Sequence, residues 1–121
     1  DRDTWQATVK HIALEGRTFV FSSCQVVREK DFPEDYAFER SDPERLMMRG
    51  GSVILSPMGK VLAGPLFDEE GILVADIDLD EVSRAKLDFD AVGHYARPDV
   101  FELKVNTAPM PAVRYCGPDV K

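Results

Sequence analysis

Residues 52–63 read SVILSPMGKVLA, and this stretch leaves the chain few choices of fold. Two apolar runs, SVILS and KVLA, stand on either side of the triplet Pro57-Met58-Gly59. Proline fixes one position of a turn and glycine supplies a positive φ, so the spacing predicts a β-hairpin. We therefore expect two adjacent strands near the middle of the chain.

A helix is predicted over residues 3–15 because its apolar side chains recur on one helical face. Asp3 or Thr4 can cap its start, and Gly16 suits the left-handed residue that ends a helix. The predicted apolar face consists of Trp5, Val9, Ile12 and Ala13.

Two more strands and a second helix complete the predicted elements. Residues 18–24 are β-branched and aromatic, and their continuous apolar centre predicts a strand that is covered on both faces. Residues 70–77, EGILVADI, predict another strand. A helix over 79–89 would be capped by Asp78 or Asp80, with Asp80 and Glu81 at its positive N-terminal end. Alternating strands and helices favour an α/β sandwich.

Two segments lack this regularity. Residues 26–50 are dense in charge and contain two prolines, and they are too long for a simple turn. We therefore predict an excursion, a kind of segment that often carries function. Residues 107–121 contain three prolines and little periodicity, so they are predicted to be a C-terminal tail.

Charge and length limit the expected partners. The chain has 121 residues, enough for one modest domain, with 15 Lys and Arg against 22 Asp and Glu and a net charge of −7. An acidic surface repels phosphate backbones, so nucleic acid is not an expected partner. Apolar runs such as 19–21 are too short to span a bilayer, so no membrane is expected either.

The cysteines bear on the expected location of the protein, and the first residue bears on whether the sequence is a fragment. Cys24 and Cys116 do not make a disulfide framework, and no secretory signal is visible, so a reducing cytoplasm is the expected location. The sequence begins at Asp1 rather than at a methionine. It is therefore expected to be a fragment or a processed chain.

Three motif-like strings fail on physical grounds. Lys60 lacks the Ser or Thr that follows the lysine of a phosphate loop. A calcium loop that started at Asp76 would need glycine where Glu81 stands. His11 and His94 are the only histidines and have no cysteine pair near them, so a structural zinc site is not predicted.

Cys24 is a possible nucleophile because it ends a predicted strand. A reactive cysteine needs a base or a positive charge beside it, and only Arg28 lies within a few residues. A buried, unreactive cysteine is the favoured interpretation.

The stretch GHYARPDVF, residues 93–101, crowds several polar side chains together. His94 and Asp99 form a possible acid–base pair. In the alternative, Arg97 and Asp99 make charge-assisted hydrogen bonds while Tyr95 packs, as interfaces favour. A structural or interface role is preferred to a catalytic one.

Three strings taken in order resemble the C-terminal part of a nitrilase: VKHIALEGRTFVFSSCQ (9–25), RGGSVILSPMGKVLAGP (49–65) and EGILVADIDLDEVSRAKLDFDAVGHYARPDVF (70–101). Within the carbon–nitrogen hydrolase superfamily, GHYARPDVF and the excursion are most typical of the true nitrilase branch. The resemblance implies an α/β fold that is the C-terminal half of a four-layer αββα sandwich. Residues 1–106, with the excursion, would form the C-terminal part of the domain, and 107–121 its tail.

The resemblance also implies a chemistry. Nitrilases hydrolyse nitriles to a carboxylic acid and ammonia without cofactor or metal, using a Glu, a Lys and a Cys that forms a thioimidate. The family nucleophile lies in a Cys-Trp-Glu-Asn string, but here Trp5 is the only tryptophan and Cys24 precedes Gln25. No catalytic residue can be carried over, so the catalytic set is expected upstream and the chain alone is expected to be inactive.

The remaining expectations concern the pocket and the partners. The resemblance implies that Gln25 and Val26 border the substrate pocket. It places the helix with Trp5, His11 and Glu15 at a two-fold interface of a homo-oligomer, a dimer that extends to a spiral. His94, Tyr95, Arg97 and Asp99 would fix the chain against its own sandwich or a neighbouring subunit. The alternatives are a non-catalytic assembly module, such as a truncated paralogue, and a split enzyme completed by an N-terminal nitrilase polypeptide.

Overall fold

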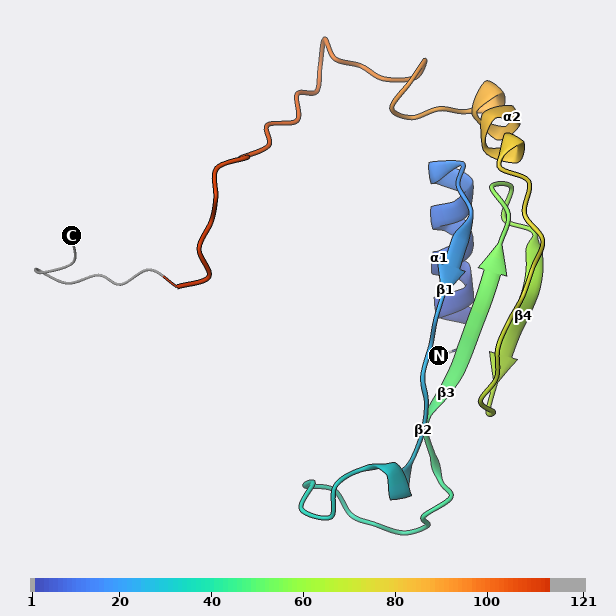
Figure 1. Cartoon of the computed structure of the whole chain (residues 1–121), viewed down its shortest axis with the longest axis vertical. Coiled ribbons are helices and arrows are strands. Elements are labelled where there is room, and N and C mark those ends of the chain that lie inside the picture. Colours follow the sequence, from blue (N-terminus) through green and yellow to red (C-terminus); the bar gives the residue numbers. More distant parts are fainter. Residues whose placement is uncertain (1, 114–121) are drawn as a thin grey trace, which may run out of the picture.

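The computed structural model of the protein describes residues 2–113. In chain order, the elements of this part are α1 (Arg2–Gly16), β1 (Val20–Ser22), β2 (Val26–Arg28), the 3-10 helix η1 (Glu29–Asp31), β3 (Leu46–Leu55), β4 (Val61–Phe67) and α2 (Asp80–Asp88) (Figure 1). The chain is therefore a mixed α/β structure.

The long strand β3 organises the sheet. It pairs antiparallel with β4 on one side, and on the other side with β1 and then, further along, with β2. The predicted hairpin is confirmed: the Ser56 amide donates to the Lys60 carbonyl at 2.9 Å, and Gly59 adopts a φ of 70° in the turn. The strands are longer than predicted, because β3 starts within the charged excursion.

Helix α1 covers one face of this sheet. Val9 and Ala13 are buried against Val53 and Leu55, with Val20 at the edge of the cluster. Two polar side chains add to this packing: Trp5 Nε1 donates to Ser22 Oγ at 3.0 Å, and Gln6 Nε2 donates to the Gly51 carbonyl at 2.8 Å. The predicted helix is confirmed, and half of its predicted apolar face is buried, whereas Trp5 and Ile12 remain exposed.

The opposite face of the sheet is open beside β1. Phe21 pairs with Ile54, and alternation along the strands directs both side chains away from α1. The side chain of Phe21 is 62% exposed. The strand predicted over 18–24 is therefore shorter, and within residues 2–113 helix α1 covers only one of the two faces that were predicted to be covered.

The strand predicted over 70–77 is absent. These residues follow the side of β4 without strand pairing, although their side chains alternate: Leu73 and Ala75 are half-buried, whereas Ile72 is 91% and Val74 80% exposed (Figure 1). Pro65 in β4 has no N–H to donate, which weakens β4 as a pairing edge. A strand is defined by its pairing, and the described chain provides none here.

Helix α2 starts one residue later than predicted. Leu79 holds the N-cap position, and Asp78 lies just before it, where its Oδ1 accepts the Asp80 amide at 3.0 Å. Asp78 Oδ2 also accepts from Arg84 Nη2 at 2.7 Å. The carboxylate predicted as a cap therefore does bind the first turn, but from outside the cap position.

Arg17 joins α2 to the end of α1. Arg17 Nη2 donates to Asp88 Oδ2 at 2.7 Å, Nη1 donates to Met58 Sδ at 3.4 Å, and the guanidinium lies 5.6 Å from the centre of the Phe89 ring. Arg17 has a φ of 47°, in the left-handed region that ends helices. The direction of α2 thus depends on the residue that follows α1.

The excursion is ordered around Glu29, which is 2% exposed. Its carboxylate accepts the Ser41 amide at 2.8 Å, and its amide donates to the Arg45 carbonyl at 3.0 Å. At the tip, the rings of Phe32, Tyr36 and Phe38 contact one another, with Arg40 over Phe38. The excursion predicted over 26–50 is thus shorter, because both of its ends belong to the sheet.

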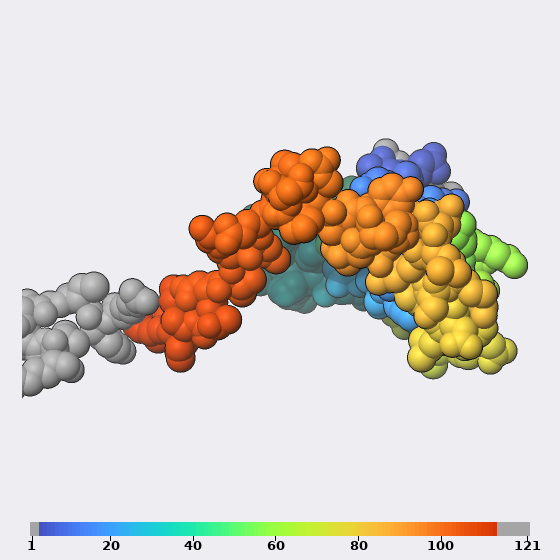
Figure 2. All heavy atoms as spheres, turned by 90° about the horizontal axis from the view of Figure 1, so that it is seen from above, coloured from blue at the N-terminus to red at the C-terminus, as the bar shows by residue number. Residues whose placement is uncertain are grey.

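Beyond α2 the chain leaves the sheet as an arm, residues 93–113, in which every side chain is exposed (Figures 1 and 2). The tail predicted over 107–121 has no regular structure up to residue 113, and its remainder, with Cys116, lies outside the described residues. None of the helices in residues 2–113 has the length and apolar character needed to cross a bilayer.

Candidate functional site

A hollow of about 280 Å³ lies at the point where β1 gives way to β2. Gln25 and Val26, which the resemblance implied would border a substrate pocket, are among the residues that line it. The other lining residues are Ser23, Cys24, Ser52, Leu66, Glu69, Glu70 and Gly71. The hollow is therefore formed by the break between two strands on one side and by the end of β4 on the other.

The hydroxyl of Ser52 creates the break between β1 and β2. It accepts the Cys24 amide at 2.9 Å and donates to the Cys24 carbonyl at 3.1 Å, so a side chain takes the place of the ladder partner. The register of β3 shifts between Gly50 and Ser52 at the same point. This shift is in the pairing of β3 with β4, and such irregularities redirect neighbouring side chains.

Cys24 is half-buried at this break. Its Sγ lies 3.6 Å from Ser22 Oγ, whose hydroxyl also accepts from the Trp5 indole. The thiol thus contacts a hydroxyl, and Cys24 is half-buried here rather than buried as the sequence predicted.

Gln25 and Val26 are held in different ways. The Gln25 side chain is exposed, and its Nε2 donates to Met48 Sδ at 2.7 Å. Val26 pairs with Arg49 in the sheet and lies over Gly50, where an added Cβ would be 2.9 Å from Val26 Cγ2. Gly50, at a φ of 77°, therefore gives Val26 the space to line the hollow.

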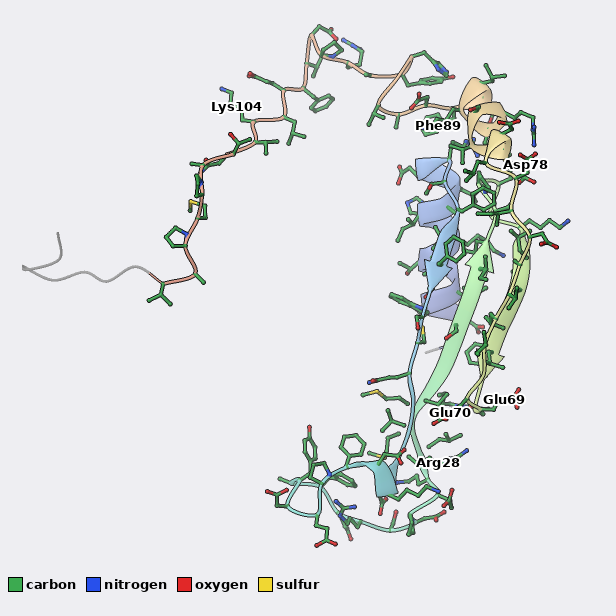
Figure 3. All side chains as sticks on the ribbon, viewed as in Figure 1. Arg28, Glu69, Glu70, Asp78, Phe89 and Lys104 are labelled. Carbon is green, nitrogen blue, oxygen red and sulfur yellow. The ribbon has the colours of Figure 1, made fainter. Side chains whose placement is uncertain are left out.

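Glu69 and Glu70 bring negative charge to the hollow. Both lie just beyond the end of β4, close to the base of the excursion (Figure 3). Residue 70 falls in the strand predicted over 70–77, and no role was predicted for Glu69. The signal that could have indicated them is the pair of carboxylates directly after the hairpin.

Asp68 fixes the chain just before these glutamates. Its carboxylate accepts from Arg49 Nε at 2.6 Å and from Arg49 Nη2, and its amide donates to the Arg49 carbonyl at 2.8 Å. The pKa of Arg49 is raised above its ordinary value, mainly by the hydrogen bonds to Asp68 and secondarily by the negative charge of Asp68. Arg49 is thus a permanent cation that stays bound to Asp68.

A second hollow, of about 510 Å³, lies on the other side of Cys24. Trp5 and Gln6 of α1 form one wall, and Leu46, Met47, Met48, Arg49, Gly50 and Phe67 form the rest. Since α1 contributes to it, this hollow belongs to the helix-covered face. The smaller hollow contains no residue of α1 and is the one bordered by Gln25 and Val26.

The residues predicted for an interface lie apart from both predicted pocket residues. On α1, His11 Nε2 and Glu15 Oε2 are 2.9 Å apart and both side chains are exposed. On the arm, the Tyr95 ring lies 5.1 Å from that of Phe89 and 4.7 Å from that of His94. Trp5 differs from them, because its indole binds Ser22 of its own chain.

The predicted bond between Arg97 and Asp99 is present. Arg97 Nε and Nη2 donate to the two oxygens of Asp99 at 2.7 and 2.6 Å. This contact lowers the pKa of Asp99 and raises that of Arg97. Asp99 therefore binds Arg97 on the exposed arm, as in the structural alternative.

Among residues 2–113, no three His, Cys, Asp or Glu side chains gather in a way that could hold a metal ion.

Comparison with known proteins fits this architecture. The profile of the carbon–nitrogen hydrolase family matches residues 2–87. A nitrilase of Bradyrhizobium diazoefficiens is 60% identical over 93% of this chain and 36% of its own length. An aliphatic nitrilase of Sinorhizobium fredii is 55% identical over 93% of this chain and 37% of its own, and an arylacetonitrilase of Trametes versicolor is 57% identical over 89% and 35%.

This chain therefore belongs to the carbon–nitrogen hydrolase family. It spans about a third of the length of the curated relatives that it matches.

Proposed function

We propose that this chain is the C-terminal portion of a true nitrilase, whose full-length form hydrolyses nitriles to carboxylic acid and ammonia. The observation that carries the proposal is identity of 55% or more to relatives named as nitrilases, over most of this chain. The hollow bordered by Gln25 and Val26 supports it, because it lies on the sheet face without helix cover.

In the proposed reaction, a cysteine thiolate supplied by the rest of the protein attacks the nitrile carbon and forms a thioimidate. One water adds to the thioimidate and ammonia leaves, which gives a thioester. A second water releases the carboxylic acid and restores the thiol. Gln25, Val26 and the end of β4 would border the substrate rather than react with it.

The open sheet face supports a four-layer αββα sandwich in the full-length protein. Phe21 is exposed on the face opposite α1, and the adjacent segment 70–77 exposes Ile72 and Val74. Isolated apolar side chains on a surface are ordinary, but a run of them along one sheet face fits a second sheet. We propose that the remainder of the protein supplies that sheet, and that the location is cytoplasmic.

The isolated chain is proposed to be inactive, because it holds no Cys-Trp-Glu-Asn string. The test is ammonia release from one aliphatic and one arylacetic nitrile, measured for the full-length protein and for residues 1–121 alone. We expect turnover in the first sample only. Turnover by the pure chain that disappears in Cys24→Ser would overturn this part, and an inactive full-length protein would overturn the whole proposal.

The arm favours a second candidate, a non-catalytic assembly module. Phe101, Leu103 and Val105 are exposed and alternate with Glu102 and Lys104, which gives a strand-like segment with one apolar side. Such a segment would add to a homo-oligomer, a dimer that extends to a spiral, or to an N-terminal nitrilase polypeptide. A monomer at all concentrations in sizing experiments would contradict this candidate.

A further inference from the structure

Arg28 lies close to the smaller hollow without being one of the residues that line it. It ends β2, the strand that begins with the hollow-lining Val26. It faces the closing end of the excursion at Glu44 and the rim of the hollow, which we define as residues 66–71. We propose that Arg28 is a positioning residue, which fixes the shape of the hollow by joining the excursion to this rim.

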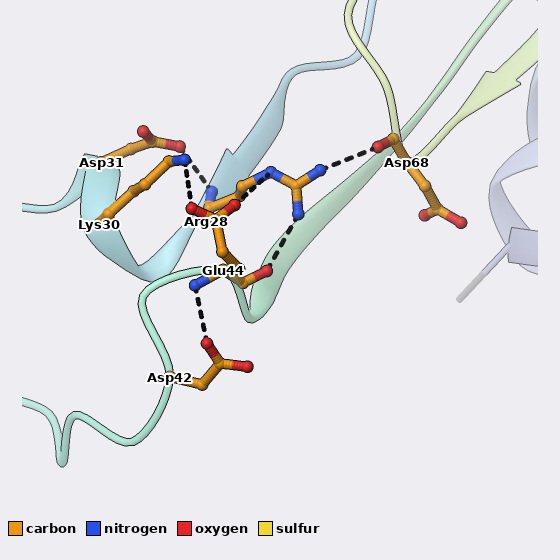
Figure 4. Close-up of polar contacts among 6 residues, drawn as sticks. All are labelled: Arg28, Lys30, Asp31, Asp42, Glu44 and Asp68. Atoms are coloured by element: carbon orange, nitrogen blue, oxygen red, sulfur yellow. Dashed lines mark hydrogen bonds and ion pairs between the residues drawn. The ribbon is translucent and has the colours of Figure 1, made fainter.

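The guanidinium of Arg28 binds two backbone carbonyls that are far apart in sequence. Nη1 donates to the Glu44 carbonyl at 3.0 Å, and Nη2 donates to the Asp68 carbonyl at 3.3 Å (Figure 4). Nε lies 3.6 Å from Glu44 Oε2. Because the side chain is 30% exposed, these bonds are partly shielded from water. The planar fork is suited to holding two fixed acceptors at once, which an ammonium does less well.

The rim needs such support because Asp68 is held in an unfavourable backbone conformation. Its φ is 68°, in the left-handed region that side chains other than glycine seldom adopt. Arg49 holds the Asp68 carboxylate and amide, and Arg28 holds its carbonyl. Every polar group of the residue that precedes Glu69 and Glu70 is thus bound, so their direction follows from these two arginines.

Lys30 provides a matched comparison. Its Nζ lies 2.5 Å from Glu44 Oε1, so it contacts the same glutamate as Arg28 without reaching Asp68 (Figure 4). Exposed pairs of this kind contribute little to stability. If Arg28 acted only by neutralising Glu44, loss of either cation would have similar effects.

The first test measures amide hydrogen exchange by mass spectrometry in the wild-type chain, Arg28→Gln, Arg28→Lys and Lys30→Gln. In Arg28→Gln we expect exchange in residues 66–71 to accelerate roughly tenfold, since charge-assisted hydrogen bonds are lost there. Arg28→Lys should restore part of the protection, and Lys30→Gln should leave the rim unchanged. Unchanged exchange in the rim, equal effects of both Gln variants, or uniform acceleration that includes α1 would each overturn the proposal.

The second test rests on the proposed function and uses the full-length protein with a nitrile substrate. Arg28→Gln should raise KM about tenfold and leave kcat nearly unchanged, because it alters the shape of the pocket and not the reacting groups. A loss confined to kcat would overturn the positioning role. If the wild-type protein turns over no nitrile, the proposed function fails, while the exchange experiment still decides the role of Arg28.

Discussion

Glu29 and Arg45 form an ion pair inside the base of the excursion, with Glu29 Oε2 2.9 Å from Arg45 Nη2. Glu29 is buried there while Arg45 is partly exposed. Removing one partner of such a pair leaves the other without its counter-charge, which destabilises more than the intact pair stabilises.

We predict that Glu29→Gln lowers the free energy of unfolding by about 1–3 kcal/mol. The Ser41 amide keeps an acceptor in this variant, but Arg45 loses its counter-ion. Urea unfolding measures the change, and limited proteolysis should show faster cleavage within residues 32–44. Glu34→Gln, at the exposed tip, is the control; equal effects of the two variants would contradict an organising role for Glu29.

Leu55 is buried between the sheet and α1, so Leu55→Ala should leave a cavity. The expected loss in the free energy of unfolding is about 2–5 kcal/mol. Ile72→Ala is the matched control in the isolated chain, because its side chain is almost fully exposed and should change stability by less than about 0.5 kcal/mol. Thermal unfolding of both variants is the measurement, and a larger effect of Ile72→Ala would place the core elsewhere.

Phe21 distinguishes the isolated chain from the full-length protein. In residues 1–121, Phe21→Ala should change stability by less than about 1 kcal/mol, because the ring is largely in water. In a four-layer sandwich the same ring would be buried, and its loss should cost about 3–5 kcal/mol. Unfolding is measured in both contexts; a small effect in both would contradict a second sheet over this face.

Asp78 should make the start of α2 sensitive to acid. Hydrogen bonding to Arg84, followed by the Asp80 amide, lowers the pKa of Asp78 below its ordinary value. The pKa of Asp78 is lower in the folded state than in the unfolded state. The ionised carboxylate therefore stabilises the folded protein above the ordinary aspartate pKa of about 4, and this stabilisation is lost as the pH falls through the pKa of the folded state.

The measurement is an NMR titration of the Asp78 carboxyl and the α2 amides. Arg84→Gln should raise the pKa of Asp78 and move the loss of α2 to higher pH. Asp76→Asn is the control and should leave the transition in place. An unchanged Asp78 titration in Arg84→Gln would show that the contact has no effect in solution.

Local patterns were sufficient to predict the hairpin and both helices. The turn at Pro57-Met58-Gly59 and the helical spacing of Val9 and Ala13 depend only on neighbours in sequence. The strand over 70–77 was predicted wrongly because it, too, rested on a local pattern. Alternation of side chains does not supply a pairing partner.

The hollow was predictable only in part. The resemblance to nitrilases placed Gln25 and Val26 at a pocket border, and the structure places both beside a hollow. The contacts that form it join distant residues: Ser52 lies 28 positions from Cys24, and Asp68 lies 40 positions from Arg28. No local pattern encodes such contacts.

Arg17 has a consequence for any assembly that this chain joins. It connects Asp88 and Phe89, the residues at the end of α2, to the end of α1, and the arm follows directly. A side chain about seventy positions earlier therefore contributes to the direction in which the last twenty or so described residues leave the sheet. We therefore expect two proteins with identical arms but different residues at position 17 to orient those arms differently. Exchanging arms between relatives would then transfer the contacting side chains but not the orientation of the arm.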